Sequence, residues 1–203
     1  MPSPSPRLLA SNVFLATTLF AGTILRLTGF TRGTVGSSAE TSSTAAGSFY
    51  HFHPDEELVI GGALVPFDWL TPPFTVYGIL PVHLLRLSLY VSGWILDWPH
   101  VDLSEPENAR RIYYVARGLA IFFSVGTMVL VWVIAKRHMG SLQANLAVAI
   151  VAYAPGAVQQ AHFFIVDGLF LFAATAAMGS IIEAAKTFIL ENLFKLLYFF
   201  INI

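Results

Sequence analysis

Charged residues are scarce in this chain. Only 11% of its 203 residues are Asp, Glu, Lys or Arg, whereas about 25% is usual for a soluble domain. The mean hydropathy is +0.68, and apolar runs of about helix length recur along the sequence. So little charge cannot cover the surface of an ordinary soluble protein. The composition therefore predicts an all-α, polytopic membrane helical bundle. The alternative is a soluble protein with a large helical core.

Cysteine is absent from the sequence. Its absence excludes disulfides and thiolate metal sites, and it leaves the redox compartment undetermined. The net charge is -1, so no strongly basic surface indicates nucleic acid as a partner.

Four apolar segments are long enough to cross a membrane, and a fifth ends the chain. The first could also be a cleaved signal peptide, but its apolar run is long for one and only Arg7 precedes it with positive charge. The predicted spans are Leu8–Phe30, Ile112–Ala135, Leu142–Val158 and Phe163–Ala185. We therefore expect a tail and first helix at 1–30, a long outer loop with interfacial helices at 31–111, three transmembrane helices at 112–186 and a hydrophobic tail at 187–203.

The outer loop contains an apolar stretch, Phe74–Leu96, that could either cross the membrane or lie in its interface. Arg86 would sit near the centre of a span, where a charged side chain is costly. The short basic loop Lys136–His138 predicts a cytoplasmic position by the positive-inside rule. An interfacial Phe74–Leu96 fits both signals and places Asp55 and Asp167 together on the non-cytoplasmic side. A spanning segment would place them on opposite sides.

The most polar motif of the outer loop is His51-Phe-His-Pro-Asp-Glu-Glu57. It follows a low-complexity stretch, Gly33–Ser48, which predicts a flexible loop in water. The motif places Asp55 and Glu56 just outside the membrane, where a carboxylate can act as a general base, a metal ligand or a solvated charge. The alternative is that Asp55 caps a helix whose first turn carries the acids.

A further acid, Asp167, stands at the edge of the apolar segment Phe163–Ala185. Acidic residues within the membrane are costly and usually functional, so Asp167 is a second candidate catalytic residue. The alternative is an acid that begins a helix at the interface.

Three arginines, Arg110, Arg111 and Arg117, cluster where the second span begins. Guanidinium groups bind phosphate through paired hydrogen bonds, so the cluster is a candidate lipid-phosphate site. The alternative is a plain interfacial anchor. We predict no metal site, although a divalent metal cofactor stays open, because three histidines could act as ligands: His51, His53 and His162.

Several motifs, taken together in their order and spacing, resemble the dolichyl-phosphate-mannose protein mannosyltransferases and the bacterial lipid A aminoarabinose transferases. The resemblance covers about Leu8 to Ala185. The motifs are Phe52-His-Pro-Asp-Glu56, Pro72-Pro-Phe-Thr-Val-Tyr77, Arg117 at the opening of a span, Ala135-Lys-Arg137, Ala154-Pro155 and Phe163-Phe-Ile-Val-Asp167.

The resemblance implies a GT-C glycosyltransferase that moves a sugar from a polyprenyl-phosphate donor to a protein or lipid acceptor, surrounded by membrane lipid. It implies a multi-pass protein of a bacterial or archaeal inner membrane or of the endoplasmic reticulum. Asp55 matches the presumed base, Glu56 its partner, Asp167 a second acid facing the same cavity, and Arg117 a recurrent basic residue. Family members are longer, and residues 187–203 lose the family texture. The resemblance thus implies an N-terminal, truncated or frameshifted piece that transfers no sugar by itself.

Two other functions stay open on the residues alone. One is a non-enzymatic membrane protein, such as a transporter fragment or accessory subunit, because transporters also place acids within their spans. Against it, transporter acids lie near the middle of the membrane, whereas Asp55 and Asp167 are expected at its edge. The other is a relic that folds without activity.

Overall fold

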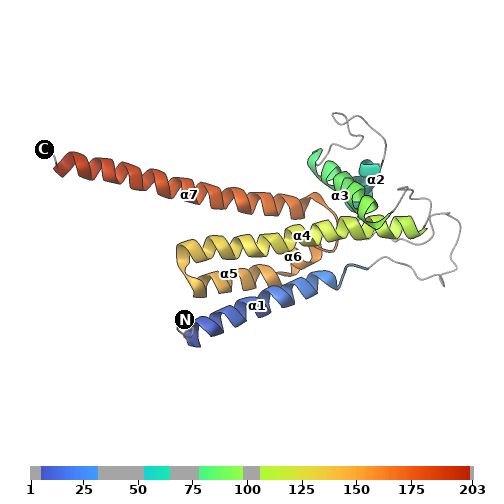
Figure 1. The fold of residues 1–203 in the computed structure, drawn as a ribbon, viewed down its shortest axis with the longest axis horizontal. Helices are drawn as coiled ribbons and strands as arrows, with labels where there is room; N and C mark the ends of the chain where they lie inside the picture. The colour runs from blue at the N-terminus through green and yellow to red at the C-terminus, as the bar shows by residue number, and fades with distance from the viewer. Residues whose placement is uncertain (1–5, 32–52, 65–77, 98–105, 202–203) are drawn as a thin grey trace.

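The computed structural model describes residues 6–31, 53–64, 78–97 and 106–201, which are mostly α-helical (Figure 1). No strand occurs in these ranges, so the prediction of an all-α helical bundle is confirmed. The low-complexity stretch and His51 lie outside the described residues. The helices are α1 (Pro6–Leu27), α2 (Pro54–Leu64), α3 (Leu80–Leu96), α4 (Pro106–Met139), α5 (Ser141–Tyr153), α6 (Pro155–Gln160) and α7 (Val166–Ile201).

Three helices of the described part are long and apolar enough to cross a membrane. Their apolar stretches are Leu8–Leu27 in α1, Arg110–Met139 in α4 and Val166–Leu193 in α7. Each exceeds the roughly 20 residues that a hydrocarbon core of about 30 Å requires. An integral membrane protein therefore follows from the fold as well as from the composition.

The expected span Leu142–Val158 is not one continuous helix. The structure forms α5 up to Tyr153, breaks at Ala154 in an extended conformation, and starts the short helix α6 at Pro155. Proline has no backbone N–H and clashes with the preceding turn, so it ends α5 here. With 13 residues, α5 is about 20 Å long and falls short of the membrane thickness.

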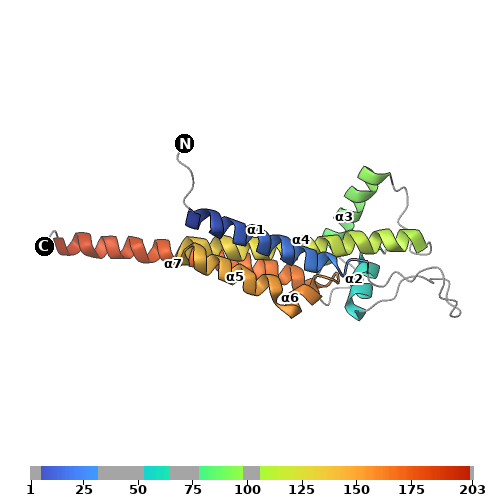
Figure 2. The same cartoon turned by 90° about the horizontal axis from the view of Figure 1, so that it is seen from below.

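The helices α1 and α5 run in one direction along the bundle and α4 and α7 run in the other, so the bundle has two distinct ends (Figures 1 and 2). At one end, here called the turn end, the start of α1 lies near the link between α4 and α5 (Figure 1). Gly140 forms this link, and its positive φ of 99° lets the chain reverse. At the opposite end lie α2, α3, α6 and the first turns of α4 and α7. We call this the acid-bearing end, because α2 and α7 begin there with their acidic residues.

The helix α3 packs against α2 and the first half of α4 through a buried apolar cluster. Arg86 of α3 donates from Nε to the carbonyl oxygen of Ala63 at 3.0 Å, near the C-terminal end of α2. The helix has 17 residues and points away from the long axis of the bundle (Figure 2). Its position along the membrane interface stays a prediction. The main members of the cluster are Val59, Ile60, Val82, Leu85, Leu89, Ile112, Tyr113, Ala116 and Phe164.

The last helix, α7, runs without interruption through the expected boundary at residue 187 (Figure 1). Its 36 residues extend about 54 Å, which is longer than the membrane core. Glu183 ties it to the turn end, because its Oε1 lies 3.5 Å from Arg137 Nη1 and 3.4 Å from His138 Nε2. Residues beyond Glu183 therefore continue past the turn end of the bundle.

Candidate functional site

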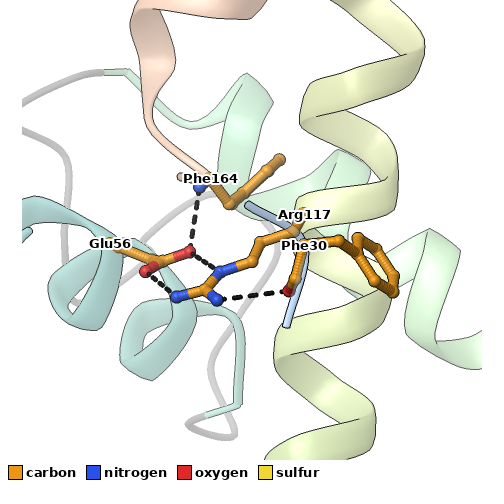
Figure 3. Close-up of polar contacts among 4 residues, drawn as sticks. All are labelled: Phe30, Glu56, Arg117 and Phe164. Carbon is orange, nitrogen blue, oxygen red and sulfur yellow. Dashed lines mark hydrogen bonds and ion pairs between the residues drawn. The ribbon is translucent and has the colours of Figure 1, made fainter. Parts of the chain in front are cut away.

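A buried ion pair joins the elements at the acid-bearing end (Figure 3). Arg117 of α4 donates from Nε to Glu56 Oε1 and from Nη2 to Glu56 Oε2, both at 2.9 Å. Both side chains are completely buried. The backbone N–H of Phe164 donates to the same Oε1 at 3.1 Å, and Arg117 Nη1 donates to the carbonyl oxygen of Phe30 at 3.3 Å. The pair therefore connects α2, α4, the end of α1 and the segment before α7.

The apolar cluster around this pair makes its hydrogen bonds essential. Charges without water cost several kcal/mol each unless their geometry and remaining hydrogen bonds compensate. Here the planar guanidinium meets the carboxylate with two parallel bonds, the strongest arrangement available to this pair. Both carboxylate oxygens of Glu56 are engaged. A direct contact between Arg117 and a lipid phosphate would require the pair to open.

The helix α2 presents its acids by its local sequence. Pro54 occupies the first helical position, which suits its fixed φ and missing N–H. His53 acts as the cap, because its Nδ1 accepts the backbone N–H of Asp55 at 3.3 Å. Asp55 therefore lies inside the first turn of the helix and does not cap it. Its carboxylate is half-buried and its Oδ2 lies 3.9 Å from His53 Nδ1.

The segment before α7 brings Asp167 to the same end of the bundle as Asp55. His53 contacts the ring of Phe163 at a centroid distance of 5.6 Å, and Glu56 binds the N–H of Phe164. Asp167 follows as the second residue of α7, where its exposed side chain accepts a hydrogen bond from Gln160 at 3.3 Å. The two acids thus share one end. That this end is non-cytoplasmic stays a prediction.

The three arginines do not form one surface cluster. Arg117 lies within the buried ion pair, whereas Arg110 is exposed and Arg111 is half-buried two turns earlier on α4. Arg110 and Arg111 therefore remain the surface candidates for binding a phosphate.

Two of the three candidate metal-binding histidines, His53 and His162, lie in the described residues, and both make hydrogen bonds to the backbone. His162 is buried, and its Nε2 lies 3.1 Å from the carbonyl oxygen of Leu25, to which it can only donate. His53 caps α2. Within the ranges that the structure describes, no three His, Asp or Glu side chains gather in a group that could hold a metal ion.

One further candidate, Arg26, was not predicted from the sequence. It is completely buried in the last turn of α1, and it donates hydrogen bonds to α4 and α5. The signal was present, because Arg26 is the only charged residue in the apolar segment Leu8–Phe30. Charges inside membrane helices usually mark function or a specific partner.

Residues 72–203, about two thirds of the chain, match the family model described as dolichyl-phosphate-mannose-protein mannosyltransferase. The match includes Arg117 and Asp167, whereas Asp55 and Glu56 precede it. It also includes residues 187–203, the tail that was expected to lose the family texture. Comparisons with curated proteins and with solved structures gave no match. By the extent of the family match, the chain belongs to the dolichyl-phosphate-mannose-protein mannosyltransferase family.

Proposed function

We propose that the acid-bearing end is the sugar-transfer site of a GT-C glycosyltransferase that takes its sugar from a polyprenyl phosphate. Membership of the family suggests a membrane glycosyltransferase and implies, in general terms, a lipid-linked sugar donor and a protein acceptor. The buried pair of Glu56 and Arg117 is the observation that carries the proposal. It holds the helix bearing Asp55 against the segment that leads to Asp167.

In the proposed reaction, an acceptor hydroxyl attacks the anomeric carbon of the donor sugar. Asp55 accepts the hydroxyl proton as the new carbon–oxygen bond forms. The bond between the anomeric carbon and the phosphate oxygen breaks, and its electrons leave with the polyprenyl phosphate. Asp167 is proposed to orient the acceptor, because its exposed carboxylate stands at the same end and is itself steadied by Gln160.

The basic residues receive two different roles in this proposal. Arg110 and Arg111, near the surface at the start of α4, steady the phosphate of the donor and of the leaving group. Arg117 is a positioning residue, since its donors are used by Glu56 and Phe30. Glu56, fully buried, is likewise a positioning residue and brings Asp55 to the surface of the site.

The location of the acids favours this proposal over a transport pathway. Asp55 and Asp167 are each the second residue of their helix, so both stand at the start of a helix and at one end of the bundle. Acids that carry a substrate or ion through a transporter lie near the bilayer midplane.

Donor binding tests the proposal without requiring turnover. The chain is purified in lipid and labelled with a radioactive, photoreactive polyprenyl-phosphate mannose. We expect saturable labelling that maps to the first turns of α4 and falls about tenfold when Arg110 and Arg111 are both changed to Gln, because charged phosphate contacts are lost. The matched control is Arg137→Gln at the turn end. Labelling that maps to the turn end, or that responds equally to the control, would contradict the proposal.

A further inference from the structure

Arg26 forms four hydrogen bonds within the bundle, and all four acceptors are uncharged. Its Nε donates to Ser124 Oγ at 2.7 Å, and Nη1 donates to the carbonyl oxygen of Gly22 at 2.8 Å. Nη1 also donates to the carbonyl of Ala152 at 3.0 Å, and Nη2 to that of Val151 at 3.1 Å. A fully buried cation is thus held by α5 and α4 with no carboxylate among these partners.

The sequence of α5 explains why two of these carbonyls are available. The last four carbonyls of a helix have no intrahelical donor. The carbonyl of Val151 has no such donor, because the residue four positions further along is Pro155, which lacks a backbone N–H. The end of a helix also carries partial negative charge, which stabilises the guanidinium. Arg26 therefore acts as the C-terminal cap of α5, supplied from α1.

A reciprocal hydrogen bond, from the region after α5 to the end of α1, forms a few residues later in the chain. His162 donates from Nε2 to the carbonyl of Leu25, one of the last carbonyls of α1. Gly29 permits the approach, because a Cβ at this position would lie only 2.2 Å from Cγ of the His162 ring. The ends of α1 and of the α5–α6 region therefore cap each other.

The segment 154–165, here called the connector, joins α5 to α7, and His162 lies within it. It contains α6, and it delivers the N–H of Phe164 to Glu56. Gln160, at the end of α6, donates to Asp167 just beyond the connector. The hydrogen bonds of Arg26 and His162 go to neither Glu56 nor Asp167. Arg26 fixes the end of α5 from which the connector starts, and His162 fixes the connector itself, close to Phe164.

We propose that Arg26 and His162 are positioning residues that hold the connector in place, so that Phe164 reaches Glu56 on the helix bearing Asp55 and Asp167 stands at the same end of the bundle. The functional meaning of this device rests on the proposed sugar-transfer site. Lysine cannot replace Arg26, because one compact ammonium group does not reproduce a planar fork that spans Ser124 and two carbonyls. The device is specific to arginine at this position and to a donor at position 162.

Thiol labelling tests the proposal, since the chain has no cysteine of its own. The reporter is Ile165→Cys, at a site in the connector that is 8% exposed. The control reporter is Leu85→Cys, completely buried in the apolar cluster. Each is combined with Arg26→Lys, Gly29→Ala, His162→Ala and His162→Gln, and the rate of modification by a small thiol reagent is measured in lipid.

We expect labelling at the Ile165→Cys reporter to rise about tenfold in Arg26→Lys, Gly29→Ala and His162→Ala, because lost charged bonds and a steric clash open the connector. His162→Gln should restore slow labelling, since its amide can still donate to Leu25. The control reporter should stay unchanged throughout. An unchanged rate in Arg26→Lys, a failure of rescue, or an equal rise at the control reporter overturns the proposal. The readout needs no donor and no turnover, so it can fail independently of the donor-binding test.

Discussion

Glu56 and Arg117 stand 61 residues apart in the sequence and meet in a two-bond ion pair with both side chains completely buried. This single relationship joins the acidic motif to a membrane helix. Removing one partner leaves the other as an uncompensated buried charge, which is more damaging than the loss of the attraction itself.

Glu56→Gln should lower the free energy of unfolding by about 3–5 kcal/mol, because it strands the Arg117 guanidinium. The double variant Glu56→Leu with Arg117→Leu should lose less than the sum of its single variants, since neither charge is then left alone. Denaturant titration in detergent, followed by circular dichroism, measures both. The matched control is Glu57→Gln, an exposed neighbour on α2. Equal stability of Glu56→Gln and this control would show that the pair does not hold the fold.

Two glycines set the distance between α4 and α7. A Cβ on Gly126 would lie 2.8 Å from the ring of Phe172, and one on Gly179 would lie 2.7 Å from Ile134. Gly126→Ala and Gly179→Ala should each destabilise the helix pair by about 1–3 kcal/mol through overpacking. Gly168→Ala is the control, because no atom lies within 4 Å of its Cβ position. If all three variants unfold at the same denaturant concentration, the close approach is not needed.

The orientation of the bundle in the membrane gives a third prediction. Single cysteines at Glu57 and Ser141, both exposed, report the acid-bearing end and the turn end. We expect an impermeant thiol reagent to label Glu57→Cys from outside and Ser141→Cys only after the membrane is made permeable, because the basic loop Lys136–His138 favours the cytoplasm. The reverse labelling pattern would invert the topology.

Asp167 should matter for transfer and little for stability. Its side chain is exposed, and its hydrogen bond from Gln160 is long at 3.3 Å. Asp167→Asn should therefore unfold at the wild-type denaturant concentration while acceptor use falls. Gln160→Ala is the comparison, since it removes the hydrogen bond and keeps the acid. A large loss of stability in Asp167→Asn would assign this residue to the fold instead.

Hydropathy alone located most of the membrane helices, because the apolar segments of α1, α4 and α7 are long and continuous. It overestimates the length of α5, because hydropathy takes no account of the helix break at Pro155. It also split α7 at residue 187 by composition, although the helix continues. Composition indicates whether a segment lies in lipid or in water, whereas the ends of a helix depend on local backbone chemistry.

The residues proposed for the site stand out in the sequence, whereas their contacts do not. The motif around Asp55 and the acid at Asp167 stood out by their polarity beside apolar segments. The pairing of Glu56 with Arg117 could not be read from spacing, because it depends on how α2 folds back onto α4. Arg26 is marked in the sequence as a charge within an apolar segment, but its partners, one serine hydroxyl and three backbone carbonyls, depend on the packing of α1 against α4 and α5.

Sugar transfer in the Asp55→Asn variant tests the central claim most directly. The rate of transfer from polyprenyl-phosphate mannose to a hydroxyl-bearing peptide is measured for the chain and for a chimera that joins it to the later spans of a longer family member. In either protein that transfers sugar with its wild-type residues, Asp55→Asn should lower the transfer rate by about 100-fold or more, because the acceptor hydroxyl loses its proton acceptor. Glu57→Gln, the exposed neighbour, should transfer at the wild-type rate. Transfer by Asp55→Asn at the rate of Glu57→Gln would contradict the account.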